Sequence, residues 1–150
     1  MDKTNEMVLR FLSRSSNESF ARVTVAAFVA QNDPTLEEIT DIKTAISEAV
    51  TNSIIHGYED GLGYVEIKAV LYPRKLIAWV SDQGKGIENI EKARQPLYTS
   101  KPELERSGMG FTVMETFMDE VDVTSTPGQG TIVKLIKHFG SPVDKERETK

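Results

Sequence analysis

A glutamate and an asparagine four residues apart are the first residues of this chain that could do chemistry together. Glu48 and Asn52 lie within residues 45–57, where apolar residues recur at helical spacing. Side chains four residues apart share one face of a helix, so a carboxylate lies beside a neutral amide oxygen. The packed side of this helix is expected to consist of Ile42, Ile46, Ala49 and Ser53. A general-base candidate beside an amide oxygen is compatible with a phosphoryl-transfer element, and only glycine-bearing segments downstream would make that interpretation persuasive.

Downstream, an aspartate and two glycines end a predicted strand in the run Asp82-Gln83-Gly84-Lys85-Gly86. The carboxylate is a hydrogen-bond acceptor at a fixed position, and the glycines let the backbone approach a ligand closely. Taken alone, the same pattern is an ordinary turn after a strand. It becomes a candidate ligand site only in combination with the other segments.

Two more glycine-bearing segments could face a ligand. Gly108 and Gly110 lie at the start of a predicted helix, and the first N–H groups of a helix can bind phosphate oxygens. A glycine hinge before a helix is the alternative. Gly130 and Thr131 lie where a turn leads into a predicted strand. Most pairs of this kind only mark the end of the turn. The sequence contains neither a Walker P-loop nor a Rossmann fingerprint, so the commoner nucleotide motifs are excluded.

The composition is typical of one soluble globular domain. The chain has 150 residues, no cysteine, and 18 basic against 23 acidic residues, which gives a net charge of −5. Without a basic cluster, direct binding to nucleic acid is not expected. Without cysteine, disulfides, thiolate catalysis and cysteine-based zinc sites are excluded. No apolar run approaches the roughly 20 residues of a membrane span, and no signal peptide begins the chain, so we expect a cytoplasmic protein with no membrane contact.

The pattern of apolar residues predicts the elements that position these side chains. Strands are expected at residues 7–12, 64–72, 75–82, 121–125 and 131–136, with two hairpin turns at 73–74 and 127–130. Helices are expected at residues 17–31, 35–57, 88–94 and 109–118. The apolar face of the first helix is expected to consist of Phe20, Val23, Ala26, Ala27 and Ala30. This order predicts an α+β fold, a two-layer sandwich with helices on one face of a mixed, mostly antiparallel sheet.

Two segments are expected to lie outside the packed core. Residues 87–107 contain two prolines and many charges, and long excursions of this kind are usually functional or disordered. Residues 140–150 have almost nothing to bury, so a disordered tail is expected after a domain spanning residues 1–139.

The order of these segments resembles the nucleotide-binding boxes of the Bergerat-fold ATPases, the superfamily of gyrase, heat-shock chaperones, histidine kinases and mismatch-repair proteins. The four boxes are Glu48-x-x-x-Asn52, Asp82-x-Gly84-x-Gly86, Gly108-x-Gly110 and Gly130-Thr131. Longer strings at residues 47–58, 93–98 and 101–111 resemble one family within it, the sporulation anti-sigma-F factors, which are serine kinases of endospore-forming bacteria. The resemblance covers residues 7–138.

The resemblance implies ATP or ADP as cofactor, together with Mg²⁺. It implies that Asp82 accepts the adenine amino group close to Thr131, and that Gly84 and Gly86 shape the base pocket. It also implies that Glu48 is the catalytic base, which takes the proton from a serine hydroxyl of a protein substrate as the γ-phosphoryl group transfers.

The resemblance also assigns the phosphate and metal contacts. It implies that Asn52 holds Mg²⁺ and that Gly108 and Gly110 face the phosphates. The excursion at residues 87–107 would then be an ATP lid, which closes over the site and excludes water. Lid residues expected to meet phosphate are Thr99, Ser100 and Lys101. A plain solvated loop is the alternative.

Partner contacts are assigned by resemblance alone. Glu18 and Arg22 lie four residues apart on the first helix, where an exposed ion pair is the ordinary interpretation. The resemblance implies that both face two proteins, the sporulation sigma factor F and the anti-anti-sigma factor that is the kinase substrate. It also implies a homodimer.

Two other functions fit the same residues. A binding module that keeps ATP as a structural ligand would need Asn52 and Asp82 but no base, so Glu48 distinguishes it from a kinase. A switch-protein kinase of a general-stress sigma pathway would share the four boxes. Only the strings at residues 94–96 and 105–107 favour the sporulation family.

Overall fold

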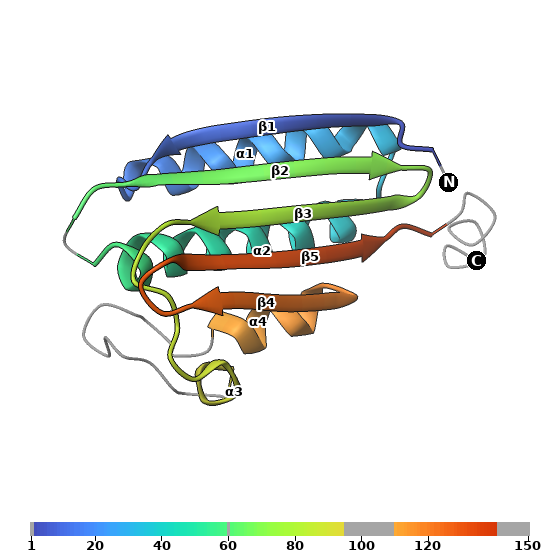
Figure 1. Ribbon diagram of the computed structural model, residues 1–150. Helices are drawn as coiled ribbons and strands as arrows, with labels where there is room; N and C mark the ends of the chain where they lie inside the picture. Colours follow the sequence, from blue (N-terminus) through green and yellow to red (C-terminus); the bar gives the residue numbers. More distant parts are fainter. Residues whose placement is uncertain (1, 60, 95–109, 141–150) are drawn as a thin grey trace.

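A single five-stranded sheet carries the fold. The structure, a computed structural model, describes residues 2–59, 61–94 and 110–140. The strands lie in the order β1-β2-β3-β5-β4 (Figure 1). Their bounds are β1 Asn5–Leu12, β2 Tyr64–Tyr72, β3 Lys75–Asp82, β4 Glu120–Thr126 and β5 Gly130–His138. All four pairings are antiparallel.

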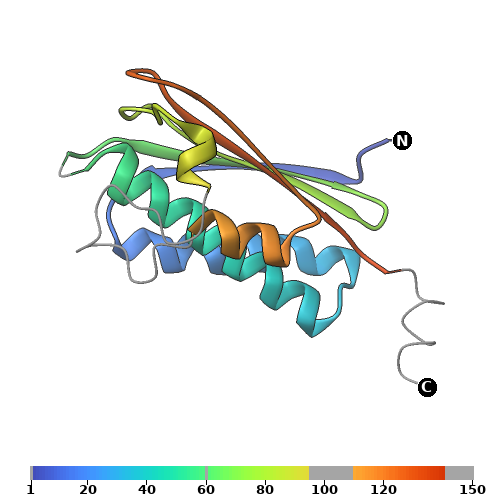
Figure 2. The same ribbon diagram turned by 90° about the horizontal axis from the view of Figure 1, so that it is seen from below.

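The helices cover one face of this sheet, and Figure 2 shows α1, α2 and α4 together beneath it. Their bounds are α1 Ser16–Val29, α2 Leu36–Asn52, α3 Ile90–Ala93 and α4 Gly110–Phe117. A 3-10 turn, η1 (Ala30–Asn32), follows α1, and a π-helical turn, η2 (Ser53–Gly57), continues α2. The predicted α+β sandwich is confirmed, and both hairpins form as expected. The sheet is antiparallel throughout, where the sequence suggested a mixed sheet, because the connection through α1 and α2 returns the chain beside β1 in the opposite direction.

The core lies between the sheet and the helices. Every second residue of β3 is buried on the helix side, from Leu76 to Asp82, and the alternate residues lie on the open face. The helix α2 is buried along Ile42, Ala45, Ile46, Ala49 and Val50. The expected packing of Ile42, Ile46, Ala49 and Ser53 is therefore confirmed. Among the described residues, no helix is long and apolar enough to cross a membrane.

The buried face of α1 differs from the expected one. Ala21, Val25 and Val29 are fully buried, whereas the side chains of Phe20 and Val23 are 53% and 56% exposed. The expected face of Phe20, Val23, Ala26, Ala27 and Ala30 is therefore wrong. This helix carries apolar residues on almost every side, so helical periodicity alone does not select the stripe that meets the core. Small and β-branched residues face inward instead.

Helix α2 is held firmly at its N-terminal end. The side chain of Thr35 accepts a hydrogen bond from the backbone of Glu38, and the Glu38 carboxylate accepts one from the backbone of Thr35. This capping box satisfies two N–H groups that the helix leaves without partners. Further along, Lys137 of β5 pairs with Asp41 at 3.0 Å and donates to the carbonyl of Phe117 in α4 at 2.7 Å. These bonds fix the position of α2 relative to the sheet.

Candidate functional site

The candidate site is organised around the carboxylate of Asp82 at the end of β3. This side chain is only 7% exposed, although it lies near the loops at one end of the sheet. The backbone N–H of Gly84 donates to Oδ1 at 2.9 Å, and the Ser53 hydroxyl and the backbone N–H of Thr131 also donate to the carboxylate. Burial raises the pKa of Asp82 above its usual value, and these hydrogen bonds oppose the rise. A donor on a ligand would therefore favour the charged carboxylate further.

Close backbone packing holds Asp82 in this position. A Cβ atom on Gly57, the last residue of η2, would lie 2.9 Å from Oδ1 of Asp82. A Cβ atom on Gly84 would lie 2.0 Å from the carbonyl oxygen of Gly57, which accepts a hydrogen bond from the N–H of Lys85 at 2.8 Å. The end of η2 thus touches both the aspartate and the loop after it. Side chains at either glycine would force these segments apart.

The turn between β4 and β5 packs against the other side of the same loop. Gly130 has φ +105°, and a Cβ atom there would lie 2.1 Å from the carbonyl oxygen of Asp82. Gly86 has φ +78°, and its Cβ would lie 2.4 Å from the carbonyl oxygen of Thr126. The N–H of Gly128 donates to the Lys85 carbonyl at 2.6 Å. Gly86 and Gly130 therefore combine a backbone conformation that favours glycine with contacts that exclude a side chain.

A hydroxyl network joins the loop to β4 and β5. The Ser125 hydroxyl accepts from the N–H of Ile87 at 2.7 Å and lies 2.8 Å from the hydroxyl of Thr131. It also donates to the carbonyl of Gly130 at 3.0 Å. Thr131 itself is only 8% exposed and is paired in register with Asp82. The first residues of the loop after β3 are fixed in this way.

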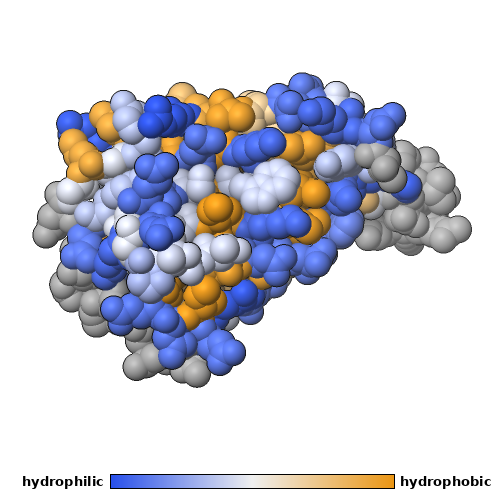
Figure 3. Space-filling view, viewed as in Figure 1, coloured by the Kyte–Doolittle hydropathy of each residue, from blue (hydrophilic) through white to orange (hydrophobic). Residues whose placement is uncertain are grey.

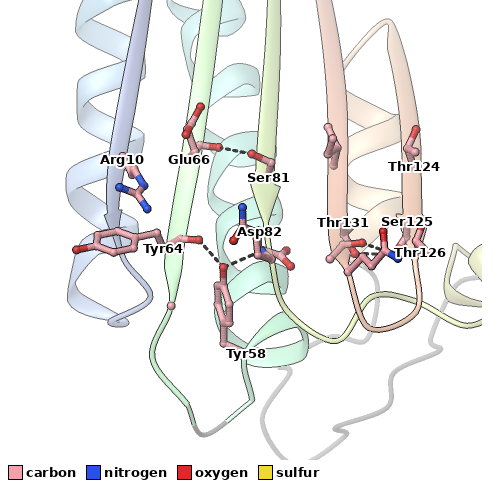
Figure 4. A pocket seen from close by; sticks show the side chains of 15 residues that line it. Arg10, Tyr58, Tyr64, Glu66, Ser81, Asp82, Thr124, Ser125, Thr126 and Thr131 are labelled. Carbon is pink, nitrogen blue, oxygen red and sulfur yellow. Dashed lines mark hydrogen bonds between the residues drawn. The ribbon is translucent and has the colours of Figure 1, made fainter.

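A hollow of about 560 Å³ lies on the open face of the sheet, opposite the helices, and reaches the site at Asp82, Gly130 and Thr131 (Figure 4). Outward-facing side chains such as Arg10, Glu66 and Ser81 line it. The guanidinium of Arg10 stacks on the ring of Tyr64 at 3.8 Å from the centroid. No lining residue belongs to α2, so the hollow is distinct from the helix side where Glu48 and Asn52 are. The two regions meet at the strand end that carries Asp82.

Comparisons with known proteins identify the family. The family of histidine kinase-like ATPase domains matches residues 13–137. An anti-sigma F factor of Thermoanaerobacter sp. (strain X514) is 64% identical over 141 residues, which are 94% of this chain and 99% of that protein. An anti-sigma F factor of Clostridium kluyveri is 65% identical over 137 residues, 91% of this chain and 96% of that protein. The chain belongs to the anti-sigma F factor family.

Other relatives agree with this membership. An anti-sigma F factor of Bacillus licheniformis is 59% identical over 136 residues, 90% of this chain and 93% of that protein. A crystal structure of the RsbU and RsbW domains of a Mycobacterium tuberculosis protein has the same fold, with a TM-score of 0.68 and 20% identity. It is matched over 93% of this chain and 34% of that longer chain. As a histidine kinase-like ATPase domain, the protein is a nucleotide-binding domain.

The structure brings part of the predicted site together. Asp82, Gly84, Gly86 and Thr131 lie around the end of β3, and Gly110 is the buried first residue of α4. On the last turns of α2, Glu48 and Asn52 are both half-buried and share a face by their spacing. The predicted phosphate contacts Thr99, Ser100, Lys101 and Gly108, with most of the predicted lid, lie outside the described residues. The predicted tail at 141–150 does so as well.

Four residues of the site were not predicted as functional. Ser53 donates a hydrogen bond to Asp82, and Gly57 packs against the Asp82 carboxylate. Ser125 accepts a hydrogen bond from Ile87 in the loop after β3, and Tyr58 accepts one from the backbone N–H of Gln83. The glycine at the end of the predicted helix was a signal for close packing, but its neighbour could not be known from the sequence. Ser53 and Tyr58 lie in the string at residues 47–58 that resembles the family, but the sequence did not show their partners, which are distant in the chain. Ser125 gave no signal.

Replacing Gly57 with alanine tests whether this packing matters for the ligand. The new Cβ would displace the Asp82 carboxylate, so we expect the affinity for ADP to fall about tenfold, the effect of about 1.4 kcal/mol. Isothermal titration calorimetry measures it. Gly61→Ala is a matched control, because its Cβ would lie 3.4 Å from its nearest neighbour, the Tyr58 carbonyl oxygen. Equal ADP affinities for Gly57→Ala and the wild type would contradict this assignment.

Proposed function

We propose that this protein is a cytoplasmic anti-sigma factor that holds the sporulation sigma factor F and is an ATP-dependent serine kinase of its anti-anti-sigma antagonist. The observation that carries the proposal is the buried Asp82 carboxylate, enclosed by glycine contacts in a chain of the anti-sigma F factor family. Membership of the histidine kinase-like ATPase domains supports ATP as the ligand. The names of the relatives support sigma factor F as a partner.

Asp82 has the chemistry needed to select adenine. The exocyclic amino group of adenine is a hydrogen-bond donor, whereas guanine carries a carbonyl oxygen at the same ring position. A carboxylate accepts from the first and repels the second, and a buried polar group left without a partner is costly. The proposed base pocket also contains Thr131, which pairs with Asp82 on the neighbouring strand β5. Gly84 and Gly86, in the loop after β3, complete it. This arrangement favours ATP and ADP over guanine nucleotides.

The α2 helix offers one oxygen ligand for a metal. The described residues hold no group of three or more His, Asp or Glu side chains that could bind a metal by themselves. Mg²⁺ usually takes one or two protein oxygens and completes its shell with phosphate oxygens and water. The half-buried amide of Asn52 fits such a role. When bound with ATP, Mg²⁺ would offset the negative charge that develops on the phosphates. The residues proposed to contact the phosphates of ATP are Thr99, Ser100, Lys101, Gly108 and Gly110.

Glu48 is the proposed base because it lies one helical turn before Asn52 on the same face. Its carboxylate would take the proton of the substrate serine hydroxyl. The serine oxygen would bond to the γ-phosphorus as the bond from that phosphorus to the bridging oxygen breaks, and ADP would leave. The capping box and the Lys137–Asp41 pair hold α2 in place, so the base is presented from a rigid element.

Glu48→Gln separates catalysis from binding. The amide cannot accept the serine proton, so we expect phosphotransfer to the anti-anti-sigma factor to fall by roughly 10²–10⁴. ATP affinity should change little. Transfer of radiolabelled phosphate measures the rate, and calorimetry measures binding. Asn52→Ala is the companion variant, in which Mg-ATP binding itself should weaken. Near-normal transfer by Glu48→Gln would contradict the role of base and favour a binding module.

The proposed partner surface lies on the outer side of α1. Arg22 approaches Glu18 at 3.6 Å and donates to the Ser19 hydroxyl at 3.3 Å, and its Nε atom is buried with no partner among the described residues. The guanidinium is thus held loosely and keeps donor capacity. On the same helix, Phe20 and Val23 expose more than half of their surface. Arginine and exposed apolar side chains are both enriched at protein interfaces.

Arg22→Ala tests this surface. We expect affinity for both sigma factor F and the anti-anti-sigma factor to fall about tenfold or more, since buried arginines often dominate interface energies. ADP affinity should stay the same, because α1 lies outside the nucleotide site. Arg74→Ala is the matched control, because it removes an exposed arginine in the β2–β3 turn. Unchanged binding of both partners by Arg22→Ala, measured by surface plasmon resonance, would show that this surface is wrong.

A homodimer is proposed through the open face of the sheet. Figure 3 shows apolar side chains among charged ones on this face, which no described helix covers. In one row across the sheet, Lys68 and Lys134 flank Trp79, with Asp122 beyond. A neighbouring row has acidic residues at both ends, Glu6 and Glu120. Val8 and Ile132 are the large apolar residues that this face exposes most, at 60% and 44%. A second copy related by two-fold symmetry can cover these apolar residues and pair opposite charges.

Ile132→Lys tests the dimer. Ile132 is 44% exposed on the open face, and a buried lysine there would oppose association, so we expect the dimer dissociation constant to rise at least about tenfold. Sedimentation equilibrium measures it. Val23→Lys is the matched control, since this exposed valine lies on α1, away from the sheet face. A wild-type protein that is monomeric at high concentration would contradict the proposal directly.

A further inference from the structure

The hydroxyl group of Tyr58 joins the ends of two strands. It donates to the carbonyl oxygen of Tyr64 at the start of β2 and accepts from the backbone N–H of Gln83, directly after β3 (Figure 4). The two distances are 2.5 Å and 2.7 Å. A phenol can donate one hydrogen bond and accept others, so both groups are satisfied by one oxygen atom.

This hydroxyl takes the place of a sheet hydrogen bond. The last pair in the β2–β3 register is Val65 with Asp82, so Tyr64 and Gln83 would form the next pair. Instead, the tyrosine oxygen lies between their backbone groups, and β3 ends at Asp82. The strands are held apart by one oxygen atom, and the chain leaves the sheet immediately after the aspartate. Tyr58 thereby helps to set where β3 ends.

The ring of Tyr58 is itself held in place. The residue follows the π-helical turn η2, and its N–H donates to the carbonyl of Ser53 at 3.1 Å. Its ring packs so closely on Gly63 that a Cβ atom there would lie 2.2 Å from Cε1. The same turn carries Gly57 against the Asp82 carboxylate. One short segment therefore contacts Asp82 through Gly57 and the backbone after it through Tyr58.

We infer that Tyr58 is a positioning residue for the base of the nucleotide, acting through Asp82. The N–H of Gly84 fixes the Asp82 carboxylate, and the hydroxyl of Tyr58 fixes the peptide between Asp82 and Gln83. With that peptide fixed, the carboxylate keeps the direction in which it accepts from the adenine amino group. The hydroxyl of Tyr58 thus increases the selectivity of the site for adenine over guanine. This inference rests on the proposed nucleotide site.

Tyr58→Phe keeps the ring and removes only the hydroxyl. The Tyr64 carbonyl and the Gln83 N–H then lose their shared partner, and the peptide after Asp82 is free to rotate. We expect the affinity for ADP to fall about tenfold, because both hydrogen bonds that orient the chain beside the Asp82 carboxylate are lost. Affinity for GDP should change much less, so the ratio of the two dissociation constants shrinks. Calorimetry with both nucleotides measures this ratio.

Two further variants complete the experiment. Tyr64→Phe is the matched control, because it removes a tyrosine hydroxyl in the same hollow but keeps the backbone carbonyl that Tyr58 uses; its selectivity should equal that of the wild type. Gly63→Ala displaces the Tyr58 ring without removing its hydroxyl and should lower selectivity in the same direction, which keeps the test available if Tyr58→Phe does not fold.

The outcomes separate the inference from the function on which it rests. Wild-type protein that binds neither nucleotide would overturn the proposed ATP site. If wild-type protein prefers ADP and Tyr58→Phe keeps the same ratio, or loses ADP and GDP affinity equally, Tyr58 has only a structural role and the inference is wrong. A smaller ratio in Tyr58→Phe, with Tyr64→Phe unchanged, supports it.

Discussion

The burial of one carboxylate, Asp82, is the constraint on which the rest of the site depends. Burial disfavours its charge and raises its pKa, so it must be surrounded by donors. Those donors come from three parts of the chain: Ser53 in η2, Gly84 in the following loop and Thr131 on β5. They can approach one another only where glycine replaces a larger residue. The charged form remains incompletely compensated, which suits a carboxylate that awaits a donor from a ligand.

The position of α2 relates the buried Asp82 carboxylate to the proposed catalytic residues. Its N-terminal end is closed by the capping box of Thr35 and Glu38, and Asp41 is tied to β5 through Lys137. Its other end continues into η2, which packs on Asp82. A helix fixed at both ends presents Glu48 and Asn52 at a set distance from the base pocket. The π-helical turn shifts the backbone by one residue in its last turn, a feature that often marks functional sites.

In our proposal, three different parts of the domain bind nucleotide, the partner proteins and a second copy of the chain. The nucleotide site lies between the end of β3 and α2, the partner surface lies on the outer side of α1, and the dimer uses the open sheet face. Exposed apolar side chains mark the last two, since Phe20 and Val23 lie on α1 and Val8 and Ile132 on the sheet. Single exposed apolar residues are common on protein surfaces, but covering them with a partner removes apolar surface from water and stabilises the complex. Tyr58 lies where the nucleotide site and the open face meet.

The hairpins, and the helix carrying Glu48 and Asn52, could be predicted from the sequence, because turn chemistry and helical periodicity are local properties. The order of the glycine segments along the chain also indicated the family. Which side of α1 is buried depends on packing in three dimensions, because a helix with apolar residues on most sides has no local preference. The same holds for the bonds of Tyr58 to residues 64 and 83, and for Gly57 against Asp82, since these contacts exist only after distant segments have packed.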